Sequence, residues 1–190
     1  MNDLHQIDIK IFATQGDDIP PFDFVPVLQR WIQEHTVPGV LIDVADYSHI
    51  HHGAGVILVA HEMNISIDYN DGRMGLLYHQ KQPREGSFSD GLRSVLNDAL
   101  AACKLLQEEP EFQGRLTFNP GDLLFMASDR LTAPNDEATT SALRKEVSEV
   151  LLGIYGEDVQ CESVADNARD RIAFSITAAK SPTLDDLVAR

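Results

Sequence analysis

The sequence is poor in cysteine, tryptophan, basic residues and long apolar runs. Its 190 residues include two cysteines and one tryptophan, and 15 lysines and arginines stand against 30 aspartates and glutamates, so the net charge is −15. No apolar run approaches the roughly 18 residues that a membrane-spanning helix needs. Phosphate backbones and anionic lipid repel a polyanion, so we expect neither a nucleic acid nor a membrane as partner.

Several functional motifs are also absent. The sequence has no G-x-G-x-x-G after a strand, no G-x-x-x-x-G-K-[ST], no G-x-S-x-G and no EF-hand spacing, which disfavours nucleotide-phosphate cradles, α/β-hydrolase chemistry and calcium loops. The cysteines, Cys103 and Cys161, form no C-x-x-C motif. The start, MNDLHQIDIK, has neither a basic n-region nor an apolar h-region, so we expect a cytoplasmic protein.

What is present is typical of a globular chain. Hydrophobic residues make up 43% of the sequence, with only 12 glycines and 9 prolines. A chain of this size buries about 70% of the surface that its unfolded form exposes. We therefore expect one compact unit.

The first eighty residues predict the order β-α-β-β-β. Alternation indicates strands at 7–14 and 40–47. A helix is expected at about 24–35 with Asp23 as its N-cap. Residues 56–68 are interpreted as one long strand, with Ile57–Val59 in the core. The Asn70-Asp71-Gly72 turn then leads to a partner strand at 73–80. On this view Val40–Gln80 is the buried centre of the molecule.

The remainder predicts a long amphipathic helix and a second set of strands. The helix covers 89–109, with Ser87 or Ser89 near its start. Short strands at 115–118 and 122–128 flank the turn at 119–122. A helix at about 136–152, with Asn135 as N-cap, precedes strands at 158–164 and 171–179. We expect the tail from Ser181 to be flexible.

The two parts have a similar order of elements, which defines the predicted fold class. We expect an α+β protein of two similar β-α-β-β(-β) halves, whose mainly antiparallel sheet is covered by helices on one face. The halves are 1–85 and 115–180, joined by the long helix at 86–114, with the tail at 181–190. Convergent element order is the alternative to a true duplication.

A histidine-rich stretch supplies candidate metal ligands. Imidazole and carboxylate bind zinc, iron or manganese, and a divalent metal is the one cofactor that the residues suggest. Six residues are candidate metal ligands, and they lie in the strand expected at 56–68, in the loop before it and in the strand before that loop. They are His49, His51, His52, His61, Glu62 and Asp46. In a straight strand, however, His61 lies about 20 Å from the loop. The alternative is a polar turn with a histidine at the end of a buried strand.

A second candidate site is the pair Glu62 and His79, which form the candidate catalytic residues. Across the expected hairpin, His79 should lie opposite a residue between Glu62 and Asn64. Contact between a carboxylate and an imidazole can tune a general base. The same contact is also a common structural hydrogen bond.

Arg130 lies close to the start of the helix expected at 136–152, and helix N-termini attract anions. Asp136 and Glu137 already offer negative charge to that helix dipole. We therefore expect ordinary helix capping here rather than an anion site.

Two stretches, LIDVADYSHIHHGAGVILVAHE and GDLLFMASDRLTAPNDEATTSALR, resemble a family of uncharacterised bacterial proteins with the same layout along most of the chain. The resemblance implies a bacterial cytosolic protein, and it carries over no activity and no catalytic residue.

Two classes of function remain open. The first is a non-catalytic binding or accessory protein, compatible with a homodimer, that uses a concave surface between the halves for a small ligand or a protein. The second is a metal-dependent small-molecule enzyme with its site in the histidine-rich loop. An acidic partner for a basic protein is a third alternative.

Overall fold

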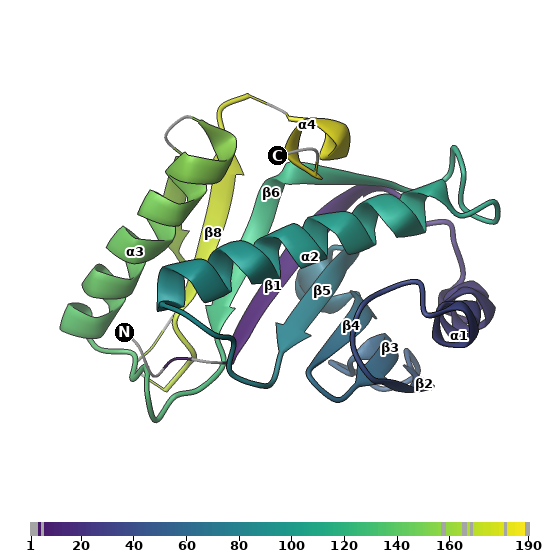
Figure 1. The fold of residues 1–190 in the computed structure, drawn as a ribbon, viewed down its shortest axis with the longest axis horizontal. Coiled ribbons are helices and arrows are strands. Elements are labelled where there is room, and N and C mark those ends of the chain that lie inside the picture. Colours follow the sequence, from purple (N-terminus) through teal and green to yellow (C-terminus); the bar gives the residue numbers. More distant parts are fainter. Residues whose placement is uncertain are drawn as a thin grey trace.

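The computed structural model describes residues 4, 6–156, 159–164, 167, 169–180 and 182–188, with the side chain of Asp71 left out. Over this range the fold is α+β, as expected, and consists of an eight-stranded antiparallel sheet and four α-helices (Figure 1). The strand order is β2-β3-β4-β5-β1-β6-β8-β7.

The strands are β1 (Ile7–Gln15), β2 (Leu41–Tyr47), β3 (Gly55–Ala60), β4 (Met63–Asp68), β5 (Gly75–Gln80), β6 (Thr117–Ala127), β7 (Val159–Ser163) and β8 (Ala173–Ala178). The helices are α1 (Phe24–Glu34), α2 (Phe88–Glu108), α3 (Glu137–Tyr155) and α4 (Leu184–Val188). Short 3-10 turns, η1 (Pro21–Asp23) and η2 (Asn70–Gly72), precede α1 and β5.

One face of the sheet is built from buried apolar side chains. Ile7, Ile9 and Ile11 of β1 are each at most 3% exposed, and neighbouring strands extend the same rows in register. Tyr78 of one row lies 3.3 Å from the carboxylate of Asp98 on α2, so α2 packs on this face and crosses the central strands (Figure 1). The row through Ile9 consists of Leu58, Ile65, Tyr78, Ile9, Phe125 and Phe174.

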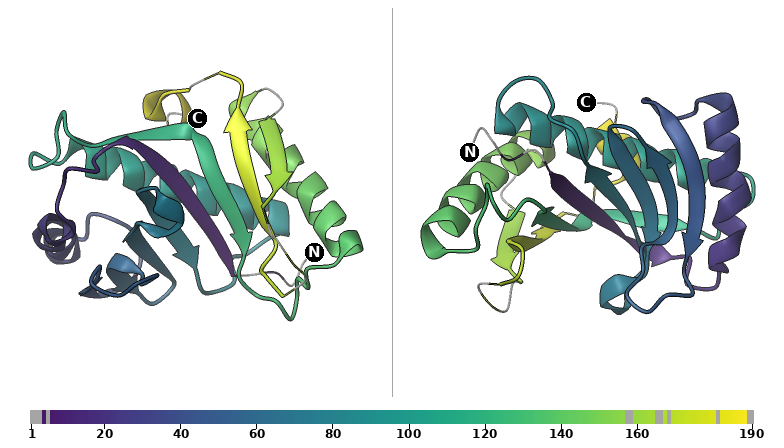
Figure 2. Two further views of the ribbon diagram at one scale, coloured as in Figure 1. Left: turned by 180° about the vertical axis from the view of Figure 1, so that it is seen from behind. Right: turned by 90° about the horizontal axis from the view of Figure 1, so that it is seen from below.

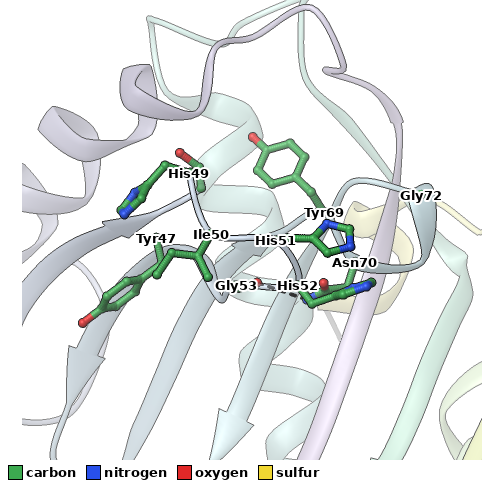
Figure 3. Close-up of a pocket in the computed structure, with 11 residues that line it drawn as sticks. Tyr47, His49, Ile50, His51, His52, Gly53, Tyr69, Asn70 and Gly72 are labelled. Carbon is green, nitrogen blue, oxygen red and sulfur yellow. Dashed lines mark hydrogen bonds between the residues drawn. The ribbon is translucent and has the colours of Figure 1, made fainter.

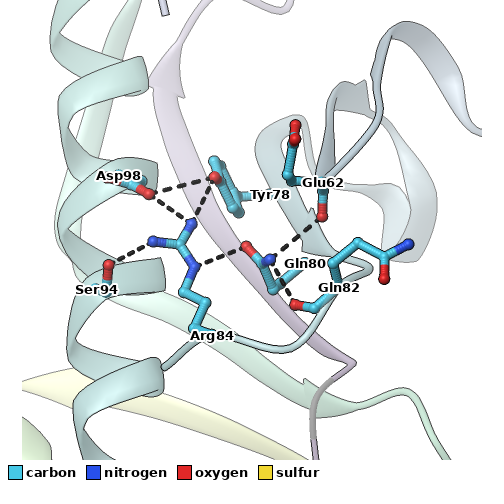
Figure 4. A network of polar contacts seen from close by, with 7 residues as sticks. All are labelled: Glu62, Tyr78, Gln80, Gln82, Arg84, Ser94 and Asp98. Atoms are coloured by element: carbon cyan, nitrogen blue, oxygen red, sulfur yellow. Dashed lines mark hydrogen bonds and ion pairs between the residues drawn. The ribbon is translucent and has the colours of Figure 1, made fainter. Parts of the chain in front are cut away.

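The start of α2 is fixed by its cap and by an arginine network. Ser87 accepts a hydrogen bond from the backbone of Asp90, whose carboxylate accepts one from the backbone of Ser87. Figure 4 shows Arg84, from the connection between β5 and α2, reaching Asp98 on α2 at 2.6 Å and Tyr78 on β5 at 3.0 Å. Burial raises the pKa of Tyr78, so its hydroxyl stays protonated and can donate at neutral pH.

Helix α1 is tied to the segment that follows α2. Arg30 donates to Glu111 at 2.7 Å and to Glu109 at 2.5 Å, and the fully buried Trp31 also donates to Glu109. The hydrogen bonds that Arg30 donates to Glu111 and, to a lesser extent, to Glu109 raise its pKa. Figure 2 shows α1 alongside the β2 edge of the sheet.

The prediction of a single long strand at 56–68 is wrong. The chain turns at His61 and Glu62, so β3 and β4 are separate antiparallel strands. The backbone amide of His61 bonds the carbonyl of Val40, and the amide of Lys81 bonds the carbonyl of Glu62. The turn contains no glycine or proline, and the alternation of apolar and polar residues continues through it. There is therefore no local signal for a turn at this point in the sequence.

The prediction of two short strands at 115–118 and 122–128 is also wrong, because β6 is one continuous strand. Its pairing with β1 shifts between Phe118, opposite Ala13, and Leu123, opposite Ile11. The Asn-Pro-Gly-Asp sequence at 119–122 therefore forms an irregularity within the strand, a place where proline and glycine are tolerated.

Further expectations differ in detail. Asp23 precedes α1 without a side-chain capping bond, and Asp136, not Asn135, caps α3. Within the segment expected to be a flexible tail, Leu184 and Leu187 of α4 are buried.

The interpretation of Val40–Gln80 as the centre of the molecule is only half right. Val56 and Leu58 are fully buried, and Ile57 is half-buried. The two middle strands of the sheet are β5, which belongs to this segment, and β1, which does not, whereas β2 is an edge strand whose Ile42 is 58% exposed. Helices α1 and α3 follow the adjacent strands β1 and β6 and lead to the edge strands β2 and β7. Duplication of one unit stays a prediction.

Candidate functional site

The predicted loop histidines gather around a shallow pocket of about 480 Å³. His49, His51 and His52 are exposed in the β2–β3 loop, with the ring centres of His51 and His52 4.0 Å apart. Figure 3 shows the ring of Tyr69 facing this loop. Asp46 accepts a hydrogen bond from the amide of Ser48, and the contacts with Ser48 lower its pKa, so this carboxylate serves the turn.

The other two candidate metal ligands lie elsewhere. His61 and Glu62 form the turn after β3, whereas the loop histidines precede it, so the length of β3, about 20 Å, separates the two groups. His61 and Glu62 contact one another at 3.3 Å, and Glu62 accepts the backbone amide of Val40. Within the part of the chain that the structure describes, no three His, Cys, Asp or Glu side chains are placed to hold a metal ion.

The predicted contact between Glu62 and His79 is wrong. Asn64 lies opposite His79 in the β4–β5 register, within the expected range, and Glu62 lies beyond the paired residues. The acid that His79 contacts is Asp8, its partner on the other neighbouring strand, β1. The acid–imidazole pair therefore exists, but with a different carboxylate.

Asp8 is the centre of a polar network that the sequence did not reveal. It is 4% exposed, and His79 Nδ1 contacts one of its carboxylate oxygens. Its other oxygen accepts from Ser128 Oγ at 2.6 Å and from Arg171 at 3.1 Å. A buried carboxylate requires such partners, and here they come from three separate segments.

Two residues further along β1, Lys10 forms a buried ion pair. It is 1% exposed; its Nζ lies 2.6 Å from Asp68 Oδ2 and donates to the carbonyl of Asn70 at 2.8 Å. The side-chain amide of Asn70 donates hydrogen bonds to the carboxylate of Asp68 and to the backbone carbonyl of Gly53. The histidine-rich loop is thereby linked to the buried pair.

Above these buried charges lies an open groove of about 950 Å³. The left view of Figure 2 shows β1, β6 and β8 in front, with α2 behind them. Its lining comes from both halves of the chain, with His52 and Arg73 from the first and Arg130 and Arg169 from the second. The lining is completed by the following residues: Lys10, Phe12, Asp68, Asn70, Leu77, Leu124, Met126, Val164, Asp170, Arg171, Ala173 and Ser175.

The groove is cationic in a chain of net charge −15. One lysine and four arginines line it, against two aspartates. Arg73 pairs with Asp122 and stacks 3.8 Å from the ring centre of Phe12, and Arg171 pairs with Asp8. Arg130 and Arg169 are exposed, and their guanidinium groups form no ion pair with any of the described residues.

The expected capping near Arg130 is confirmed. Asp136 accepts the backbone amide of Thr139 at 2.8 Å at the start of α3. This bond and a second contact with Thr139 lower the pKa of Asp136. The helix end is therefore occupied by its own acid, and Arg130 faces the groove instead.

Comparison of the chain with protein-family models, curated proteins and solved structures finds no match. The resemblance to a bacterial family therefore stays a prediction. None of the helices that the structure describes has the length and apolar character to cross a membrane.

Proposed function

We propose that this chain is a non-catalytic binding protein that takes a small organic anion in the groove between its two halves. The observation that carries the proposal is the convergence of five cationic side chains on one groove of a strongly acidic protein. As part of the proposal, the helices cover the opposite face of the sheet and leave the groove to the ligand.

The two unpaired guanidinium groups are the expected contacts for the anion. Arg130 and Arg169 both line the groove, and the planar fork of a guanidinium matches the two oxygens of a carboxylate or the oxygens of a phosphate. Because neither has an acidic partner among the described residues, binding an anion there breaks no existing ion pair.

The buried charges support binding rather than catalysis. Lys10 is neutralised by Asp68, and Asp8 by Arg171. Both pairs lie under the groove, where they hold the strands and loops that form its floor and walls. A groove of about 950 Å³ is also within the size range of small-molecule sites, roughly 300–1,000 Å³.

Calorimetric titration with inorganic phosphate, succinate and octanoate tests the proposal. At least one of these anions should bind, and Arg130→Ser with Arg169→Ser should weaken it about 25-fold, fivefold for each exposed ionic contact of about 1 kcal/mol. Arg93→Ser is the matched control, because Arg93 is an exposed arginine on α2 outside the groove. Absence of binding by all three anions, or equal loss in the control, would overturn the proposal.

A further inference from the structure

The floor of the groove has a chemical character of its own, distinct from its cationic walls. Leu77, Leu124 and Met126 are half-buried and line it. In a sheet that exposes polar side chains to water, these positions would hold polar residues. Here the groove face carries Leu77 on β5 and Leu124 and Met126 on β6, next to the polar His79 and Asp122 of the same strands.

The register places these side chains on one face of the sheet, in two neighbouring rows. One row consists of Leu77, Lys10, Leu124 and Ser175, and the next of His79, Asp8, Met126 and Ala173. The apolar strip therefore crosses the sheet diagonally, from Leu77 on β5 past the buried Lys10 to Leu124 and Met126 on β6 and Ala173 on β8.

Lys10 lies between these apolar side chains, but it is buried and its ammonium is engaged at one end. Its Nζ is bound to Asp68 and to the Asn70 carbonyl. Its stem lies against Gly75, where an added Cβ would come within 3.0 Å of Lys10 Cε. The side chain that would otherwise place a charge in mid-floor is thus drawn aside.

We propose that the ligand is a soluble single-chain amphiphile, with a carboxylate or phosphate head on Arg130 and Arg169 and an alkyl chain along the apolar strip. The proposal rests on the proposed function and names the class of its ligand. Charge complementarity places the head on Arg130 and Arg169, and the apolar strip accounts for the alkyl chain. A compact anion such as phosphate would leave this strip unused.

The test is the dependence of affinity on chain length in the unmodified protein. Calorimetric titration with unbranched carboxylates of four to ten carbons, below their micelle concentrations, should show affinity rising about twofold for each added methylene. Full burial of a methylene gives about fourfold, and an open groove covers about half of each. Decanol, which has the chain without the charge, should bind at least tenfold more weakly than decanoate.

Variants locate the chain. Leu124→Ser should remove most of the dependence of affinity on chain length. Leu152→Ser is the matched control, since Leu152 is an exposed leucine on α3 outside the groove. It should leave the dependence of affinity on chain length unchanged. Thermal melting of both variants without ligand checks that they fold.

The outcomes separate this inference from the proposed function. If anions bind through Arg130 and Arg169 with the same affinity at every chain length, the proposed function stands and the amphiphile is refuted. Recruitment of the protein to phosphatidylglycerol vesicles, with no binding of free decanoate, would likewise refute a soluble amphiphile. If no anion binds, both fail.

Discussion

The ion pair between Lys10 and Asp68 offers the sharpest test of how this sheet is held together. Replacing Lys10 by Met retains most of the buried stem but leaves the carboxylate of Asp68, 4% exposed in the pair, without its cation. With the charged atoms 2.6 Å apart, their attraction at an effective dielectric constant of about 20 is about 6 kcal/mol.

Most of that attraction is offset by the cost of taking both ions out of water, which is several kcal/mol for each. The measurable effect is therefore the cost of leaving one charge alone. We expect Lys10→Met to lower the free energy of unfolding by about 3–5 kcal/mol. Asp68→Asn should cost a similar amount, because it strands the ammonium, although Asn70 still offers it a carbonyl.

The assay is urea denaturation of the two single variants and the double variant. Lys10→Met with Asp68→Asn should cost at least 2 kcal/mol less than the sum of the single changes, since removal of both charges leaves neither unpaired. Lys104→Met is the matched control, because Lys104 contacts Asp185 at the same distance, 2.6 Å, on the surface. Exposed pairs contribute little, so equal losses for Lys10→Met and Lys104→Met would refute the reasoning.

Three further predictions concern single groups. Ser87→Ala removes the hydroxyl that caps α2 and should lower the free energy of unfolding by about 1 kcal/mol, with the exposed Ser141→Ala as control. The contacts of Asp90 with the Ser87 hydroxyl and amide lower its pKa from 3.8, so the stability that Asp90 adds should be complete above pH 4 and be lost as the pH falls further. In denaturant titrations, the loss of stability caused by Asp90→Asn should therefore disappear at low pH. A loss of stability independent of pH would contradict this. Tyr69 has a buried hydroxyl without a partner among the described residues, so Tyr69→Phe should raise stability by about 1 kcal/mol, and a lower melting temperature would show that the hydroxyl is bound.

The helices could be predicted from the sequence because their signals are local. The apolar stripe at 89–109 and the serine before it specify α2, observed as Phe88–Glu108 with Ser87 as its cap. The turn at His61 and Glu62 could not be predicted, because its backbone partners lie far away in the sequence: the amide of His61 donates to the carbonyl of Val40, and the carbonyl of Glu62 accepts from the amide of Lys81. The Asn-Pro-Gly-Asp sequence led to the opposite error, the prediction of a turn within a continuous strand, since the pairing of β6 with β1 continues past it.

The groove was out of reach of sequence patterns for a related reason. Its cations come from positions 10, 73, 130, 169 and 171, and no spacing links them. The one local signal was the alternation of Asp8 and Lys10 with isoleucines in β1. That pattern indicates a polar, solvated face, yet both side chains are buried, because loops from both halves fold over them.

The net charge also misleads about small ligands, although it is informative about large ones. A charge of −15 opposes an extended polyanion, which must lie against much of the surface. At physiological ionic strength, however, charges more than about 8 Å away are largely screened, so a small anion in the groove experiences mainly the side chains that line it. There Arg130 and Arg169 are two cations without an ion-pair partner among the described residues, against the single unpaired carboxylate of Asp170, while Asp68 and Asp8 are already neutralised by their partners. An acidic surface and an anionic ligand are therefore compatible, and the surface charge adds selectivity by leaving anions few other places to bind.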